Sequence, residues 1–180
     1  MKIALAGYSG AGKSTLAQRL GTQYGVPVLH LDTVQWVPGW RERDAEEQQR
    51  IVREFLDSHG AWVIDGNYSA LCFERRMEEA DRIVLLLLPR FVCLLRVLRR
   101  YRRWKGRTRP DMGEGCAEKV DAAFLRWVLW DGRTGRKRKR FAELARRYPD
   151  KTVVVRSRRA LERLRLDSLP PEGKVPRRGG

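Results

Sequence analysis

One short segment near the N-terminus combines glycines, a lysine and hydroxyl side chains at a spacing that suits phosphate chemistry. Residues 7–14 read Gly-Tyr-Ser-Gly-Ala-Gly-Lys-Ser, directly after an apolar run and before a helical pattern. Glycines let the backbone curl so that amide N–H groups point at phosphate oxygens; the lysine adds a positive charge and the serine hydroxyl a magnesium ligand. The motif therefore predicts a site for ATP and Mg²⁺. The candidate binding residues are Gly7, Ser9, Gly10, Ala11, Gly12, Lys13, Ser14 and Thr15.

Two aspartates stand where predicted strands end, Asp32 after residues 26–31 and Asp65 at the end of 61–65. The carboxyl ends of parallel strands meet at one edge of a sheet, so both carboxylates are expected beside the phosphate loop. One could hold magnesium-bound water, and the other could take the proton of an attacking hydroxyl. The sequence does not say which does which. We take Lys13, Asp32 and Asp65 as catalytic candidates, and Ser14 with Asp65 as metal candidates.

Simpler interpretations stand beside these. Asp32 could be a plain turn or helix cap, and Asp65-Gly66 could be a hairpin turn, although a helical pattern rather than a second strand follows it. His30 lies inside a strand and is expected to pack rather than react. Trp36, Trp40 and Arg41 could form a pocket for an aromatic base and a phosphate, or could simply pack.

A cluster of arginines between Arg99 and Arg109 surrounds Trp104. Phosphoryl transfer needs cations that offset the charge on the transferring group, and Arg103 and Arg107 are the catalytic candidates from this cluster. Each arginine could instead belong to a solvated helix face. The helical pattern from Phe91 places Arg96, Arg99, Arg100 and Arg103 on one face, away from the apolar one.

Five apolar segments alternate with helical patterns and must position these residues. This alternation predicts an α/β fold, a three-layer sandwich with a five-stranded parallel sheet covered on both faces. The predicted strands are 2–7, 26–31, 61–65, 83–88 and 152–156. Helices are predicted after the phosphate loop to residue 24 and over 45–59, 69–80, 91–103, 120–128, 141–148 and 158–164, with loops over 34–40 and 105–119.

Charge is distributed unevenly along the chain. Residues 1–90 hold 11 basic and 12 acidic side chains, whereas residues 91–180 hold 27 basic and 10 acidic ones. This balance predicts an anionic partner: a phosphorylated ligand, nucleic acid or an acidic membrane surface. The three widely spaced cysteines give no disulfide framework, and the most apolar stretch is too short to span a bilayer. We expect a cytoplasmic protein with one domain over 1–168 and a disordered basic tail over 169–180.

Three groups of residues, read together, carry a resemblance: the phosphate loop, Asp65-Gly66-Asn67-Tyr68, and Thr108-Arg109-Pro110-Asp111-Met112 with Gly115-Cys116. On these, the chain resembles the bacterial DNA topology modulation proteins, which belong to the adenylate-kinase-like P-loop class. The resemblance implies the P-loop nucleoside triphosphate hydrolase fold in its nucleoside-monophosphate-kinase-like form, with a lid-like loop over about 105–119. The chain departs from true adenylate kinases in lacking a long lid domain and a four-cysteine zinc lid, which puts AMP as acceptor in doubt.

Two function hypotheses follow. In the first, the chain is a kinase that transfers the γ-phosphate of ATP to a small acceptor, either nucleotide-like or a hydroxyl compound. In the second, it is an ATP-binding nucleic-acid-associated protein whose main footprint is the basic run Arg133 to Arg140. Attachment to anionic lipid through the same basic segments is a third, weaker idea. The sequence favours the kinase because it explains the carboxylates at the strand ends.

Overall fold

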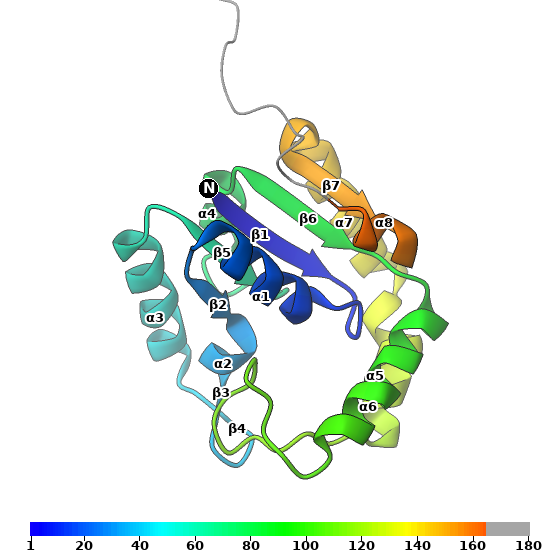
Figure 1. Ribbon diagram of the computed structural model, residues 1–180. Helices are drawn as coiled ribbons and strands as arrows, with labels where there is room; N and C mark the ends of the chain where they lie inside the picture. Colours follow the sequence, from blue (N-terminus) through cyan, green and yellow to red (C-terminus); the bar gives the residue numbers. More distant parts are fainter. Residues whose placement is uncertain (165–180) are drawn as a thin grey trace, which may run out of the picture.

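A single parallel sheet forms the centre of the molecule, and its strands run in the order β2-β5-β1-β6-β7 (Figure 1). The computed structural model describes residues 1–164, so the predicted tail over 169–180 lies outside the described residues. The sheet confirms the predicted α/β fold with five parallel strands. Its strands are β1 (Lys2–Gly7), β2 (Val28–His30), β5 (Trp62–Asp65), β6 (Arg82–Leu86) and β7 (Thr152–Val155).

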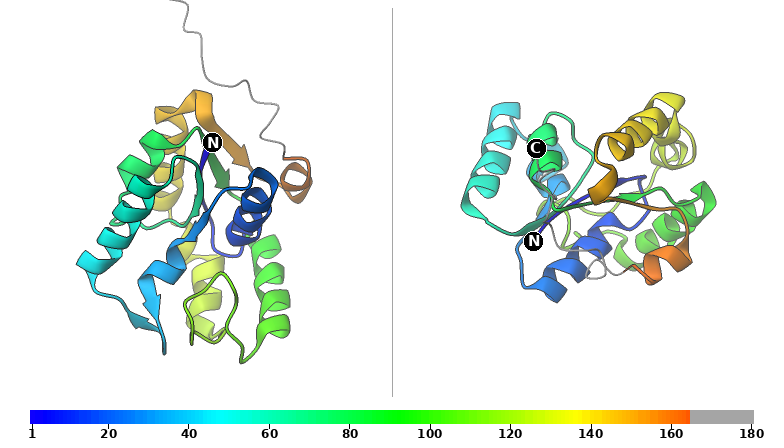
Figure 2. Two further views of the ribbon diagram at one scale, coloured as in Figure 1. Left: turned by 60° about the vertical axis from the view of Figure 1, so that its left-hand side comes forward. Right: turned by 90° about the horizontal axis from the view of Figure 1, so that it is seen from above.

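Helices cover both faces of the sheet and make three layers. In the right-hand view of Figure 2 the sheet is nearly edge-on, with α3, α4 and α7 on one side and α1, α5 and α8 on the other. Two separate hydrophobic clusters fill the spaces between the layers. The main helices are α1 (Lys13–Tyr24), α2 (Leu31–Gln35), α3 (Ala45–Ser58), α4 (Phe73–Glu79), α5 (Arg90–Trp104), α6 (Ala122–Leu129), α7 (Gly135–Arg147) and α8 (Arg158–Glu162).

Strands β5 and β6 are apolar except for Asp65 at the end of β5 and Arg82 at the start of β6, which suits a sheet that is covered on both faces. Every residue of β5 and β6 is buried, including Trp62 and Ile83, and β1 is buried from Ile3 onward. In a sheet with one solvated face, these residues would alternate with polar ones. The continuous runs read from the sequence therefore correspond to a sheet enclosed on both sides.

The strand order sets the position of the candidate carboxylates. β5 lies between β1 and β2, so that Asp65 is in register with Leu5 on one neighbour and with His30 on the other. This brings the carboxyl end of β5 directly beside the loop that follows β1. Asp65 is therefore adjacent to the phosphate loop by sheet topology alone.

Several predicted segments differ in the structure. The helix predicted over 141–148 begins at Gly135 instead, so that most of the basic run Arg133 to Arg140 lies in α7. The predicted loop at residues 34–40 instead begins in the short helix α2, where Thr33 Oγ1 donates to the carbonyl of His30 (2.7 Å), and continues into a hairpin. This hairpin pairs β3 (Trp36–Val37) with β4 (Arg41–Glu42) around the predicted Pro38-Gly39 turn. Helix α4 starts at Phe73 rather than near Ser69 because the carbonyls before it are bound by a buried arginine, described below.

Side-chain caps begin several of the helices, α3 and α8 among them. Asp44 caps α3 by accepting from the amides of Glu46 and Glu47 (2.9 and 3.2 Å), and Ser157 caps α8 by accepting from Ala160 (3.1 Å). The three cysteines form no disulfide. Among residues 1–164, no helix has the length and apolarity that crossing a membrane requires.

Candidate active site

The phosphate loop connects β1 to α1 in a conformation that depends on its glycines. Gly7, Gly10 and Gly12 have φ values of +138°, +75° and +97°. A Cβ would lie 2.2 Å from the Leu86 carbonyl oxygen at Gly7, and 2.3 Å from the Arg96 guanidinium at Gly12. Only glycine avoids both the strain and the clash. The result is an open backbone cradle at the start of a twelve-residue helix, the geometry that binds phosphate through amide N–H groups.

Not every residue of the loop faces this cradle. Ala11 is fully buried, and its amide donates to the carbonyl of Tyr8 (3.2 Å), so it packs within the loop. Lys13 Nζ lies 3.3 Å from the carbonyl oxygens of both Gly7 and Tyr8. Its ammonium is therefore held over the loop, where a phosphate would replace these weak contacts.

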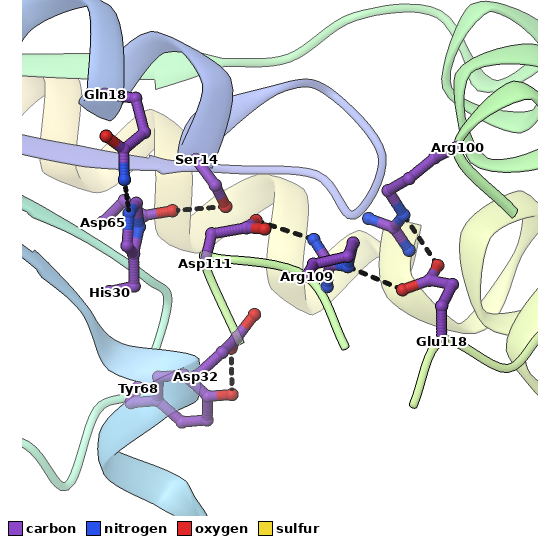
Figure 3. A network of polar contacts seen from close by, with 10 residues as sticks. All are labelled: Ser14, Gln18, His30, Asp32, Asp65, Tyr68, Arg100, Arg109, Asp111 and Glu118. Atoms are coloured by element: carbon purple, nitrogen blue, oxygen red, sulfur yellow. Dashed lines mark hydrogen bonds and ion pairs between the residues drawn. The ribbon is translucent and has the colours of Figure 1, made fainter. Parts of the chain in front are cut away.

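Asp65 links the loop to the neighbouring strand. Ser14 Oγ donates to Asp65 Oδ2 at 2.9 Å, while His30 Nδ1 bonds Asp65 Oδ1 at 2.5 Å (Figure 3). Asp65 is 5% exposed and His30 6%. A serine hydroxyl beside a carboxylate, both hard oxygen donors, is the set that Mg²⁺ takes when most of its other ligands are phosphate and water. No cluster of three or more His, Cys, Asp or Glu side chains that could hold a metal ion occurs among residues 1–164.

The histidine next to Asp65 is electrostatically coupled to it. Burial acts to lower the pKa of His30, but its hydrogen bond to Asp65 and the negative charge of Asp65 outweigh burial. Asp111 and Asp32 add to the same effect, so the pKa of His30 is raised above its ordinary value of 6.5. Its other ring nitrogen, Nε2, is 2.9 Å from the Gln18 amide. His30 is packed, as expected, and in addition orients the carboxylate of Asp65.

The segment after β5 carries two further polar groups into the site. Asn67 makes a double hydrogen bond with the backbone of Gly7, accepting from its amide (2.9 Å) and donating to its carbonyl (2.7 Å). Tyr68 donates its hydroxyl to Asp32 Oδ1 at 2.5 Å. Burial first, and the charge of Asp32 second, raise the pKa of Tyr68 strongly, so the phenol stays protonated and remains a donor.

A fully buried arginine holds that segment in place. Arg76 Nε donates to the Leu71 carbonyl and Nη2 to the Tyr68 carbonyl, both at 2.7 Å. Burial lowers the pKa of Arg76 to about 10, which still leaves it charged at neutral pH. These bonds satisfy carbonyls that would otherwise be orphaned between β5 and α4.

A cavity of about 790 Å³ joins these groups. All of the phosphate-loop candidates except Ala11 line it, as do Asp32, Asp65 and Arg103. Arg107 is exposed and is not among the lining residues. One wall is the face of α5 that the helical pattern marked as basic, which we call the arginine wall: Arg96, Arg99, Arg100 and Arg103.

A chain of ion pairs crosses from the arginine wall to the opposite side. Arg100 Nε and Arg109 Nε bind the two oxygens of Glu118 (2.8 and 2.6 Å), and Arg109 Nη1 binds Asp111 at 2.6 Å (Figure 3). Arg109 and Glu118 are both buried. This network fixes the 105–119 segment across the mouth of the site, although the segment has no regular secondary structure beyond isolated bridges.

The hairpin β3–β4 anchors the other side of the 105–119 segment. Trp40 Nε1 donates to the carbonyl of Ala117 (3.0 Å), and the amide of Gly39 donates to the carbonyl of Gly115 (3.3 Å). The rings of Trp36 and Trp40 meet edge to face, 5.8 Å between centroids. Neither tryptophan lines the cavity, nor does Arg41, so the alternative that these residues pack is the one the structure supports.

The basic run Arg133 to Arg140 does not form one continuous surface. Arg133 lies over the Tyr8 ring (4.0 Å) and donates to the carbonyls of Val128 and Leu88. Lys137 lies over Trp127 (3.4 Å) and Arg140 over Phe73 (4.6 Å), and both border the cavity. Part of this charge is thus directed at the phosphate-loop cavity, and the structure does not support the run as a nucleic-acid footprint.

Reasoning from the sequence missed several residues of this site. Asn67, Tyr68 and Asp111 entered only as parts of a resemblance, and Lys137 and Arg140 only as part of a basic run. The signal that could have found Asn67 and Tyr68 was their place just after Asp65, because segments that follow a strand's carboxyl end face the ligand. For Asp111 no local pattern exists, because the 105–119 segment brings it there by tertiary contacts.

Comparison with known proteins gives a fold and no family. No protein-family model matches the chain, and no curated protein matches its sequence. Among solved structures, TT1252 from Thermus thermophilus is 19% identical and has a TM-score of 0.51, over 90% of this chain and 91% of that chain. Shikimate kinase from Bacteroides thetaiotaomicron is 20% identical, with a TM-score of 0.47, over 90% and 92%. A gluconokinase from Sinorhizobium meliloti 1021 is 19% identical, with a TM-score of 0.44, over 86% and 81%.

At such identities the likeness concerns the fold alone. Together with the phosphate-loop motif, the strand order and the helices on both faces, it assigns the chain the P-loop nucleoside triphosphate hydrolase fold. The resemblance to the DNA topology modulation proteins is not confirmed by these comparisons and stays a prediction.

Proposed function

We propose that the chain is an ATP-dependent phosphotransferase that moves the γ-phosphoryl group to a hydroxyl of a small acceptor. One observation carries the proposal: a single cavity brings the phosphate loop, both strand-end aspartates and the arginine wall together. A protein that used ATP only as a switch would need the loop but not a second carboxylate and four arginines facing it.

The phosphate loop would hold the nucleotide through its amide N–H groups and Lys13. Ser14 and Asp65 are the residues that fit Mg²⁺, since their oxygens already meet at 2.9 Å. When bound, this ion would offset the negative charge of the phosphates. His30 keeps one carboxylate oxygen of Asp65 engaged, so that Oδ2 is the oxygen turned toward Ser14.

Asp32 is then the carboxylate that accepts the proton of the acceptor hydroxyl. The acceptor oxygen attacks the γ-phosphorus, its proton passes to Asp32, and the bond between the γ-phosphorus and the bridging oxygen breaks to release ADP. Tyr68 donates to the Oδ1 atom of this carboxylate and fixes its direction. This division of labour chooses between the two aspartates on contacts, where the sequence left the choice open.

The 105–119 segment acts as the lid in this proposal. It reaches the cavity through Arg109 and Asp111 and is tied to the arginine wall through Glu118. Closing over the nucleotide would exclude water, whose attack would otherwise waste ATP. Arg103, at the wall, is placed to offset charge on the transferring group, whereas Arg107 would have to move to do so.

The test is phosphate transfer from Mg-ATP to a panel of hydroxyl compounds. Transfer is detected by measuring ADP release and by isolating the phosphorylated product. Wild-type protein is compared with Lys13→Ala and with Lys139→Ala, an exposed lysine outside the cavity. We expect transfer to at least one acceptor, a loss of about 10²–10³-fold in Lys13→Ala, and no change in Lys139→Ala. ATP binding without transfer to any acceptor would refute the phosphotransferase.

A further inference from the structure

One part of the cavity lining has a different chemistry from the arginine wall, and no role so far accounts for all of its residues. It is formed by α2, β4, the start of α3 and the 105–119 segment. We call it the acidic end: Asp32, Gln35, Glu42, Gln48 and Asp111. Every one of these side chains ends in a carboxylate or an amide.

These groups are held to one another and to the backbone. Gln35 Nε2 donates to Glu42 Oε1 at 2.9 Å, and Gln48 Nε2 donates to the carbonyl of Arg43 at 2.6 Å. Gln48 is 6% exposed, so its amide is fixed by its surroundings. The bonds involve one polar atom of each side chain, which fixes the direction in which the remaining atoms point.

The sign of the charge at this end is negative. Three carboxylates, Asp32, Glu42 and Asp111, border it against one guanidinium, that of Arg109. Arg109 is already bound by two carboxylates, Asp111 and Glu118, at 2.6 Å each. A phosphate on the acceptor would therefore meet uncompensated like charge here, whereas hydroxyl or ammonium groups would find acceptors.

The five side chains of the acidic end are all non-aromatic, so they offer no ring on which a nucleobase could stack. Trp36 and Trp40, the aromatics nearest in sequence, are packed against the 105–119 segment and each other and do not line the cavity. Tyr68 borders this end, but its hydroxyl is committed to Asp32. The recognition that these five side chains themselves offer is hydrogen bonding rather than stacking.

We propose that the acceptor is a small polyhydroxylated compound without phosphate, either uncharged or carrying an amine, bound at the acidic end. The inference rests on the proposed function for its role in transfer, but not for the binding itself. A site built to hydrogen-bond hydroxyls discriminates strongly against analogues that leave its buried polar groups unpaired. Nucleoside monophosphates, the acceptors of the fold class to which the chain was likened from its sequence, are excluded by the same charges.

Binding is measured first, by calorimetry with Mg²⁺ and a non-hydrolysable ATP analogue present. The probes are matched pairs: ribose and ribose 5-phosphate, glucose and glucose 6-phosphate, adenosine and AMP, with glucosamine and free myo-inositol added. We expect a free sugar, amino sugar or polyol to bind at least about tenfold more tightly than any phosphorylated member of the panel. A difference of about tenfold in affinity corresponds to the free energy of roughly one unfavourable contact between like charges. Tighter binding of AMP or a sugar phosphate overturns the inference, as does failure of every free polyhydroxyl compound to bind.

A charge reversal at the acidic end adds a second criterion. Glu42→Lys should reduce the preference for the unphosphorylated member of each pair, while Glu46→Lys, an exposed carboxylate on α3 outside the cavity, should leave it unchanged. Equal effects of the two variants would contradict the acidic end as the binding site. Both positions are exposed, so folding is preserved in both variants.

Transfer is then measured with the compound that binds, which separates the two proposals. Binding with transfer supports both. Binding of a free polyhydroxyl compound without transfer supports the inference about the ligand and refutes the phosphotransferase. Transfer to a nucleoside monophosphate supports the phosphotransferase and overturns the inference.

Discussion

The two ends of the cavity are built from different parts of the chain and carry opposite charge. The arginine wall is one face of a single helix, α5, with its cations repeated at helical spacing. The acidic end is assembled from α2, β4, α3 and the 105–119 segment, each of which contributes one or two side chains. A site for a polyphosphate needs only density of positive charge, whereas a site for a particular acceptor needs groups at particular positions.

Asp65 borders the same cavity, and its position depends on the sheet rather than on either end. It is the last residue of β5, in register with both β1 and β2. A carboxylate at the end of a central strand is held by the sheet and does not belong to a loop. We call Asp65, with its partners Ser14 and His30, the seam. Variants at the seam, at the wall and at the support of the 105–119 segment should therefore have different consequences.

The largest effect is expected at the seam. Asp65→Asn removes the charge that faces Ser14 and His30 while preserving shape, so phosphate transfer should fall by about 10²–10³-fold. Asp57→Asn is the matched control, because Asp57 is an exposed carboxylate paired with Arg75 outside the cavity. The measurement is the rate of transfer at saturating Mg-ATP, and a loss under about fivefold would remove Asp65 from its assigned role.

Substitutions in the arginine wall should have a smaller effect, and this effect should be confined to the use of ATP. Among residues 1–164, Arg99 and Arg103 make no ion pair, yet both border the cavity. Replacing both by alanine should lower kcat/KM for ATP by about tenfold to a hundredfold while leaving acceptor binding intact. Arg102→Ala, on the same helix but outside the cavity, tests whether charge alone matters. If Arg102→Ala has the same effect, α5 acts through its net positive charge, and the positions of Arg99 and Arg103 at the cavity do not matter.

His30 should link the stability of the seam to pH. Its pKa is raised in the folded protein, so the stability that comes from the protonated imidazole beside Asp65 is fully present below 6.5, its ordinary pKa. This contribution is lost as the pH rises through the higher, folded-state pKa. His30→Gln should therefore lower the free energy of unfolding by about 2 kcal/mol near pH 6, and by less as the pH increases.

Urea unfolding between about pH 6 and pH 9 measures this difference, since the interval spans the range above the ordinary histidine pKa. The chain's other histidine, His59, lies at the end of α3 and bonds the Phe55 carbonyl, so His59→Gln serves as the control. A constant difference between wild type and His30→Gln across the interval would show that His30 only packs.

The sequence was informative where a feature repeats or is contiguous. The phosphate loop is one run of residues, the strands are unbroken apolar segments, and the arginines of α5 recur at helical spacing, so all three could be read locally. Asp65 could be placed because parallel strands end at a common edge. The predicted fold is confirmed for these reasons.

The acidic end could not be predicted in the same way. Gln35, Glu42 and Gln48 have no spacing that sets them apart from surface residues, and Asp111 reaches the cavity only because Arg109 and the hairpin hold the 105–119 segment there. For Trp36 and Trp40 the sequence left two interpretations open for a related reason. Aromatic side chains serve stacking and packing equally well, and only tertiary structure distinguishes the two.

The smallest effect is expected where the hairpin supports the 105–119 segment. Trp40→Phe keeps an aromatic ring but removes the hydrogen bond from Nε1 to the Ala117 carbonyl, which should cost about 1 kcal/mol of stability. The segment carries Asp111, so the acceptor should bind more weakly, whereas ATP affinity, set by the phosphate loop and the arginine wall, should not change. Urea unfolding and separate titrations of the two ligands measure these quantities. Equal weakening of both ligands would mean that the segment supports the whole cavity, and the two ends would then not be independent.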